Sequence, residues 1–250
     1  MAKTSGLGDN LYIAGFDASG DIQQLGSISG GPALLNFTDI TRSAYVRQGG
    51  HRSGQIEYTA FFNTVPVAGG THEKLAALPR TDQILTYCRG TTLGDPAASL
   101  VSKQINYDPT RADDGMLTFA VSAQSNGYGI EWGRQLTAGI RTDTAATNGT
   151  GIDTTASASF GGQAYLQVFA FTGTDVTVKI QDSADNVSFA DVAGFSFTQV
   201  TAGPTSERIA LSNTATLRRY LRAVTVTTGG VTSVSFSVNV IKNDVAGVTF

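Results

Sequence analysis

Apolar and polar residues alternate along most of the second half of the chain. Val176, Val178 and Ile180 alternate with polar neighbours, and the same period of two recurs at residues 233–240. This period, with one apolar face, is typical of a β-strand that is buried on one side. Turn residues such as Gly203-Pro204 separate the strands, which predicts a β-sandwich or jelly roll. The predicted strands are residues 163–171, 175–181, 195–200, 207–211, 220–227 and 233–240.

The first half of the chain is also mainly β in its pattern, with one short helix. Residues 55–63 alternate most clearly, with Ile56, Tyr58 and Ala60 on one face. Residues 71–78 predict a helix that Thr71 caps and that Pro79 ends. The other predicted strands are residues 11–16, 20–28, 33–40, 83–89 and 98–107.

Two adjacent carboxylates, Asp113 and Asp114, stand directly before Gly115 and an alternating run at residues 116–123. Aspartate tolerates turn geometry, and glycine supplies a positive φ at little steric cost. A calcium loop would need oxygen ligands at alternate positions and a later glutamate. The stretch therefore indicates the turn of a β-hairpin, and a catalytic or metal centre is the less favoured interpretation.

A composition shift at about residues 141–162 suggests how the chain is organised. This segment is rich in Thr, Ala, Gly and Ser and has few large apolar residues, which is typical of a linker or a long surface loop. We therefore expect two domains, residues 1–150 and residues 151–250.

Charge and cysteine content exclude several classes of function. The 250-residue chain has a net charge of -3 and only 15% charged residues, so we expect no basic face for binding nucleic acid. A single cysteine, Cys88, excludes an internal disulfide and a cysteine-rich zinc site. No secretory signal or membrane span is apparent, which predicts synthesis and folding in a cytoplasm.

The residues that could carry catalysis stand in no known motif. His51 lies in a Gly-rich segment, His72 in the predicted helix and Cys88 within an apolar strand. A nucleophile and base could in principle be drawn from them, and Glu57 and Glu131 could form a carboxylate pair. Packing or surface roles explain each of them more simply. We predict no enzymatic activity and no catalytic, cofactor-binding or metal-binding residue.

Two features keep a carbohydrate-binding alternative open. Tyr12, Tyr128 and Trp132 could stack on sugars, although such residues more often fill a core or a subunit contact. Residues 178–192 and 218–224, which include Arg222, resemble strands of galactose-binding-like jelly rolls. A module formed by residues 160–250 would then bind host-surface glycans.

Four segments of the first 150 residues carry a second resemblance. They are TSGLGDNLYIAGFDASGDI (4–22), GQIEYTAFFN (54–63), HEKLAALP (72–79) and KQINYDPTRADDGMLTFAVSAQSNGYGIEWGRQLTAGIRTDTAATNG (103–149). In this order they resemble the major tail proteins, or tail tube proteins, of long-tailed bacteriophages, especially those of actinobacterial hosts. The C-terminal sandwich looks like the extra domains that such subunits carry.

The resemblance implies a structural virion protein without a cofactor. Its fold would be a β-sandwich or half-barrel with one short helix, followed by the C-terminal β-sandwich. Six copies would join into a ring, and rings would stack into the hollow tail tube that delivers phage DNA. The implied partners are further copies of the chain, the terminator, tape measure and distal tail proteins, and DNA that passes without specific binding. The protein would be assembled in the host cytoplasm and reside in the virion tail, not in a membrane.

Residue patterns agree with assembly in several respects. Long strands with uncharged polar faces need partners for their edges, and repeated contacts between copies supply them. Phe61 lies on the face opposite Ile56, which indicates that both faces of its strand meet protein. The Gly-rich residues 26–32 and 47–54 are candidate mobile loops that order on stacking. The structural alternative is a capsid decoration or minor tail protein.

Overall fold

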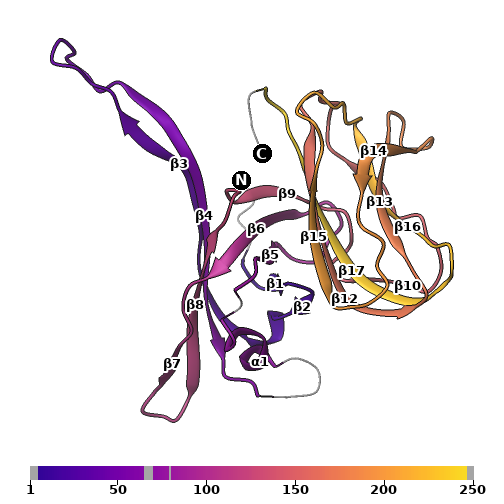
Figure 1. Cartoon of the computed structure of the whole chain (residues 1–250), viewed down its shortest axis with the longest axis horizontal. Coiled ribbons are helices and arrows are strands. Elements are labelled where there is room, and N and C mark those ends of the chain that lie inside the picture. Colours follow the sequence, from indigo (N-terminus) through magenta and orange to yellow (C-terminus); the bar gives the residue numbers. More distant parts are fainter. Residues whose placement is uncertain (1–4, 65–69, 79, 247–250) are drawn as a thin grey trace. The chain divides into compact units, whose positions relative to one another are not determined.

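The computed structural model describes residues 5–64, 70–78 and 80–246, and within these ranges the protein is mainly β (Figure 1). Besides the strands it contains a 3-10 turn at Ser19–Asp21 and one short helix, α1 at Thr71–Leu75. No helix in the described ranges is long and apolar enough to cross a membrane. The strands are β1 Asn10–Ile13, β2 Phe16–Asp17, β3 Ile22–Asn36, β4 Arg47–Phe61, β5 Gln83–Cys88, β6 Pro96–Gln104, β7 Asp108–Arg111, β8 Leu117–Ser125, β9 Glu131–Gln135, β10 Arg141–Asp143, β11 Ile152–Asp153, β12 Gly162–Gly173, β13 Thr177–Ser183, β14 Ala190–Ser196, β15 Thr205–Ala210, β16 Tyr220–Val226 and β17 Val231–Lys242.

Contacts divide the chain into two compact units that are interleaved in the sequence. The sandwich unit comprises residues 1–20, 84–99 and 131–250, and the arm unit comprises residues 21–83 and 100–130. Strand β6 contributes its first residues to the sandwich unit and its last residues to the arm unit. A division of the chain at residue 150 stays a prediction.

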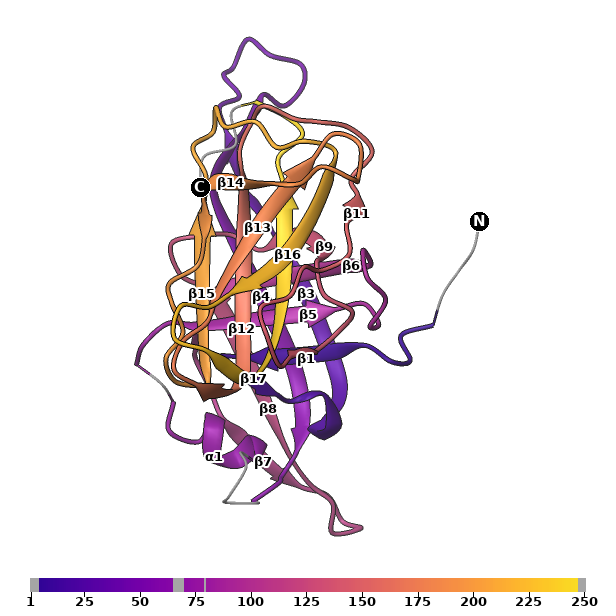
Figure 2. The ribbon, with the colours of Figure 1, turned by 90° about the vertical axis from the view of Figure 1, so that its right-hand side faces the viewer.

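The sandwich unit buries its main core between two antiparallel layers. One layer contains β15, β12 and β17 in that order, and the other runs β11-β16-β13-β14 (Figure 2). Inward side chains such as Phe195, Phe236 and Leu166 come from both layers and are almost fully buried. The alternating pattern thus predicted this sandwich correctly. The strand expected at 195–200 lies earlier in the chain: β14 spans Ala190–Ser196, and it pairs with β13 from Asp182↔Ala190.

The opposite face of β12 packs against a second set of strands in the same unit. Strands β9, β6, β5, β1 and β2 continue the first layer. Tyr12, Cys88 and Ala97 are buried together there. The predicted strand at residues 11–16 is split into β1 and β2 by a turn at Gly15, whose φ is +78°. The Gly15 amide donates to Oε1 of Gln167 on β12 at 2.7 Å, which holds this turn in place.

Residues 141–162, expected to form a linker or surface loop, run along the sandwich. Strand β10 pairs with β17, and β11 pairs with β16. The Gly149 amide donates to the Ala223 carbonyl at 3.0 Å. The Arg141 guanidinium donates to both carboxylate oxygens of Asp143, at 2.8 and 2.6 Å. Small and hydroxyl residues here satisfy backbone groups along a sheet edge.

The arm unit is built on one long antiparallel hairpin. Strand β3 pairs with β4 from Ile22↔Ala60 to Asn36↔Arg47. Strand β8 pairs with β4 only over residues 55–61, and the last residues of β6 and all of β7 pair with β8. Figure 1 shows the hairpin extending well beyond β8. The buried faces of β4 and β8 carry Ile56, Tyr58 and Phe119, as the alternation predicted.

The prediction of mobile loops at residues 26–32 and 47–54 was wrong. The first segment lies within β3 and the second within β4. The same pairing joins the two strands expected at 20–28 and 33–40 into one. The glycines serve close packing at the base of the hairpin. A Cβ at Gly54 would lie 2.5 Å from the backbone nitrogen of Ile130, and a Cβ at Gly30 would lie 2.7 Å from its side chain.

Helix α1 is shorter than predicted and is anchored differently. The N-cap position is Gly70, not Thr71, and no side chain caps the helix. The hydroxyl of Thr71 instead donates to the Asp21 carboxylate. That carboxylate also accepts from Asn63 Nδ2 at 3.0 Å, which ties the helix to the start of β3. Pro79, the predicted end of the helix, lies outside the described residues.

The hairpin predicted around the paired aspartates is confirmed. Strands β7 and β8 pair antiparallel across the turn, where Gly115 has a φ of +90°. Asp114 Oδ1 accepts from the Met116 amide at 2.9 Å. Both aspartates are exposed. The turn explains why this stretch has its sequence without invoking chemistry.

Two aspartates of the sandwich unit have low pKa values. Asp185 accepts from the backbone amides of Ser188 and Val187 at 2.8 and 2.9 Å, and these bonds lower its pKa to about 2. Asp153 accepts two bonds from the Arg219 guanidinium at 2.8 and 2.6 Å, which lower its pKa to about 2. Ordinary aspartates titrate at about 3.9.

We predict that stability falls between about pH 4 and pH 2 partly because of these two groups. A depressed pKa contributes stability above the unfolded pKa, and this contribution is lost as pH falls toward the folded value. The double variant Asp153→Asn/Asp185→Asn should therefore lose less stability over this window. Urea midpoints measured at several pH values test this, and equal slopes for variant and parent would contradict it.

Candidate assembly surface

The residues considered for nucleophilic catalysis occupy structural positions. His72 Nδ1 lies 2.5 Å from the Tyr107 hydroxyl, and its ring lies 4.4 Å from the Phe62 ring. His51 is exposed on β4. Cys88 is buried, and burial together with the nearby Asp17 and Asp9 charges raises its pKa to about 12. A thiol with so high a pKa is a poor nucleophile near neutral pH.

The two glutamates belong to different units, and each has its own partner. Glu57 Oε2 accepts from Ser27 Oγ at 2.9 Å within the arm unit. Glu131 is almost fully buried in the sandwich unit, where Arg208 donates to it at 3.1 Å and the Tyr165 hydroxyl also donates. Glu131 stands at the start of β9, as expected for a strand-end charge, and its carboxylate is buried and paired. The sequence contains no local signal of this pairing because Arg208 is distant along the chain.

The aromatic residues and Arg222 are also dispersed. Tyr12 is buried against Phe169, with ring centroids 4.9 Å apart, so it offers no platform. The Arg222 guanidinium donates twice to Gln181 Oε1 and stacks on Phe189 at 4.1 Å. Trp132 and Tyr128 are both exposed, but they belong to different units. Within the described ranges, no three His, Cys, Asp or Glu side chains are grouped as a metal site.

Much of the hairpin formed by β3 and β4 makes no strand pairing with the rest of the arm unit. Among the described strands β3 pairs only with β4, and residues 47–54 of β4 pair only with β3. We call residues 29–54 the arm. A two-stranded ribbon alone in water is marginally stable. Its free edges therefore invite a further partner.

The end of the arm, residues 34–46, presents a large apolar surface, and we call it the arm tip. Ile40 at its apex is fully exposed. A cluster of this size on a ribbon is unusual for a surface that meets only water. The exposed apolar side chains of the arm tip are Leu34, Leu35, Phe37, Ile40, Tyr45 and Val46.

Hydrogen bonds hold the arm tip in a defined shape. The Phe37 amide donates to the Val46 carbonyl at 2.9 Å, and the Val46 amide donates to Thr38 Oγ1 at 2.9 Å. The Arg47 guanidinium lies 4.6 Å from the centre of the Tyr45 ring. The apolar side chains are thus displayed by an ordered turn, which reduces the entropy lost when a partner binds.

Charge is distributed unevenly between the arm and the rest of the chain. Three arginines and one aspartate give the arm a net charge of +2, which leaves -5 for the remaining residues of a chain whose total is -3. Opposite net charges favour association of the arm with the body of another copy. The sequence contained this signal, but overall charge concealed it.

No protein-family model matches this sequence. No curated protein matches it either. Among solved structures, the chain is similar to the Dit protein of phage SPP1, described as a hub adsorption apparatus protein in phages that infect Gram-positive bacteria. That match has 13% identity, covers 94% of this chain and 99% of the other, and has a TM-score of 0.34.

Two further structures show similarity. The sheath/tube terminator of an extracellular contractile injection system has 7% identity, covering 53% of this chain and 97% of the other with a TM-score of 0.41. A chain of the phage p2 baseplate in its activated conformation has 8% identity, covering 94% and 99% with a TM-score of 0.35.

Proposed function

We propose that this protein is a structural subunit of a bacteriophage tail that assembles with copies of itself into stacked, hexameric rings of the tail tube. The arm carries the proposal, because its apolar tip and its free strand edges have no partner strand within the described chain. The resemblance of residues 1–150 to tail tube proteins supports the same function.

A second copy of the chain is the occupant that fits the arm best. The arm is positively charged and the rest of the chain is negatively charged, so each copy offers a surface complementary to the arm of its neighbour. Contacts of this kind join different patches on the two copies, and they produce rings or open stacks. Phe61, exposed at the far end of β4 from the arm tip, is a separate apolar side chain that a neighbouring copy could cover.

The net charge also suits a DNA conduit. Phosphates bind tightly to clusters of Lys and Arg, with an affinity that depends on salt. The chain outside the arm is acidic overall, so a wall formed by it would repel DNA and let it slide. In this proposal the three arginines of the arm are occupied by neighbouring copies.

The variant Phe37→Lys/Ile40→Lys tests the proposal. We expect the parent chain to form rings on the order of 100 Å across, the size of six ordinary domains, and to stack into tubes at high concentration. The variant should remain monomeric, because two lysines at the apex oppose burial of the arm tip. Negative-stain electron microscopy and sedimentation velocity measure both outcomes.

A matched control is Val187→Lys in the sandwich unit, where another apolar side chain is largely exposed on a loop. This variant should assemble like the parent, and all three chains should have similar thermal stability because exposed positions are altered. A parent chain that stays monomeric at high concentration and is absent from virus particles would contradict the proposal. Equal assembly by the arm variant would exclude the arm as the contact.

A further inference from the structure

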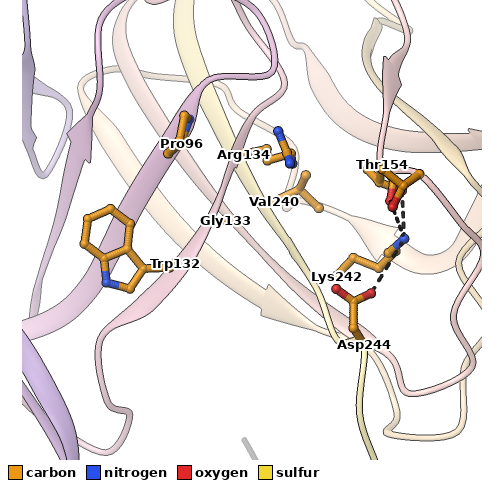
Figure 3. A pocket seen from close by; sticks show the side chains of 9 residues that line it. Pro96, Trp132, Gly133, Arg134, Thr154, Val240, Lys242 and Asp244 are labelled. Carbon is orange, nitrogen blue, oxygen red and sulfur yellow. Dashed lines mark hydrogen bonds and ion pairs between the residues drawn. The ribbon is translucent and has the colours of Figure 1, made fainter. Parts of the chain in front are cut away.

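A pocket of about 260 Å³ lies on the sandwich unit (Figure 3). Strands β6, β9 and β17 and the turn after β11 form its walls. Its volume is near the lower end for ligand sites, which are about 300–1,000 Å³. Its lining includes Pro96, Trp132, Arg134, Thr154, Lys242 and Asp244.

Trp132, the only tryptophan of the chain, forms one end of the pocket. It is 51% exposed. Figure 3 shows its indole on the same side as Pro96. Tyr87 contacts it edge-on at 6.2 Å between ring centroids, which holds the indole without covering it. An indole held in place but left exposed is an apolar platform for a flat ligand.

Polar side chains form the other end of the pocket. Lys242 is buried and donates to Thr154 Oγ1 at 2.8 Å and to the Thr154 carbonyl at 3.1 Å, so it fixes this wall of the pocket. Burial lowers the pKa of Lys242, although the nearby Asp244 opposes this effect. Asp244 is 77% exposed and lies 3.7 Å from the ammonium of Lys242. It offers carboxylate oxygens to a ligand.

Arg134 lies between the two ends, two residues after Trp132 on β9, so both point to the same side of the strand. One of its nitrogens donates to the Gly94 carbonyl at 3.1 Å, which orients the guanidinium and leaves other donors available. The pocket therefore presents an apolar plane, a donor group and an acceptor group among its lining residues.

We propose that this pocket binds a saccharide, with one sugar face stacked on Trp132 and its hydroxyls bonded by Arg134 and Asp244. A pyranose has an apolar face of C–H groups and a rim of hydroxyls that both donate and accept, which matches this arrangement. An anionic ligand matches less well, because Lys242 already donates to Thr154 and Asp244 repels negative charge. This inference does not depend on ring assembly. The stacking residue, Trp132, lies outside residues 160–250, whereas Lys242 and Asp244 lie within them.

Fluorescence of the single tryptophan tests the proposal directly in the full-length chain. Glucose, galactose, rhamnose, N-acetylglucosamine and their disaccharides are titrated to about 10 mM, which covers weak binding. At least one sugar should change the emission with a saturable curve. Calorimetry with that sugar should show at least a tenfold loss of affinity in Trp132→Ala and a clear loss in Asp244→Asn.

Tyr128→Ala, which removes another exposed aromatic residue, is the matched control and should bind like the parent. Circular dichroism verifies that each variant is folded. No saturable change with any of these sugars would overturn the proposal, as would unchanged affinity in Trp132→Ala. Emission that changes only with protein concentration would also overturn it, because it would assign the pocket to another copy of the chain.

Discussion

Replacing Arg208 by methionine is expected to lower the free energy of unfolding by about 3–5 kcal/mol, because it leaves a buried carboxylate without its partner. Arg208 donates to both oxygens of Glu131 at 3.1 Å, and the exposed fractions of the two side chains are 7% and 2%. The Tyr165 hydroxyl completes the cluster and accepts from Arg208 at 3.0 Å. Urea denaturation followed by circular dichroism gives the measurement.

The double variant Glu131→Gln/Arg208→Met separates the buried charge from the lost packing. It should recover part of the stability lost in Arg208→Met, because no ion remains buried and unpaired. A single variant that loses less than about 1 kcal/mol would show that water reaches Glu131, a result typical of exposed ion pairs.

Substituting Gly54 by alanine is expected to destabilise the arm unit by about 1–3 kcal/mol through overpacking. The new Cβ would lie 2.5 Å from the backbone nitrogen of Ile130 and 2.8 Å from its Cβ. Backbone atoms cannot rotate away as a flexible side chain can, so β4 must move relative to Ile130. Such a shift at the base would also move the arm tip, and assembly should weaken as stability falls.

Gly20→Ala is the matched control, because a Cβ there meets no atom within 4 Å. Its stability should lie close to that of the parent. Denaturation midpoints and sedimentation velocity should be measured on the same preparations. Normal stability and assembly in Gly54→Ala would show that close packing of Gly54 against Ile130 is not needed to position the arm.

Local patterning predicted the strands well, because burial on one face of a sheet leaves a period of two in the sequence. The alternation at residues 55–61 appears in β4 with the same face buried. In β17 the expected apolar face is buried, but Ser237 and Asn239 on the other face are buried as well. Turn residues also marked the hairpin at Gly115 correctly. These features depend on neighbours in the chain, and so a sequence contains them directly.

Features set by contacts between distant residues could not be predicted in the same way. The glycines of the arm indicated mobility, whereas close approach to Ile130 is what requires Gly54. The pairing of Glu131 with Arg208 joins positions far apart in the sequence. The exposure of Trp132 depends on where β9 lies in its sheet. The sequence therefore indicated Trp132 as a candidate stacking residue, but it did not predict the pocket around it.

The interleaving of the two units sets an order in which the protein can fold during synthesis. The arm unit ends at residue 130, whereas the sandwich unit needs residues up to β17. A ribosome adds about 5–20 residues per second. The arm unit can therefore fold before β12, which packs against β1 and β5, has been synthesised. A nascent chain therefore displays the arm tip before the residues that complete the sandwich unit are made. In the proposed assembly, neighbouring chains on one messenger RNA could meet through that tip.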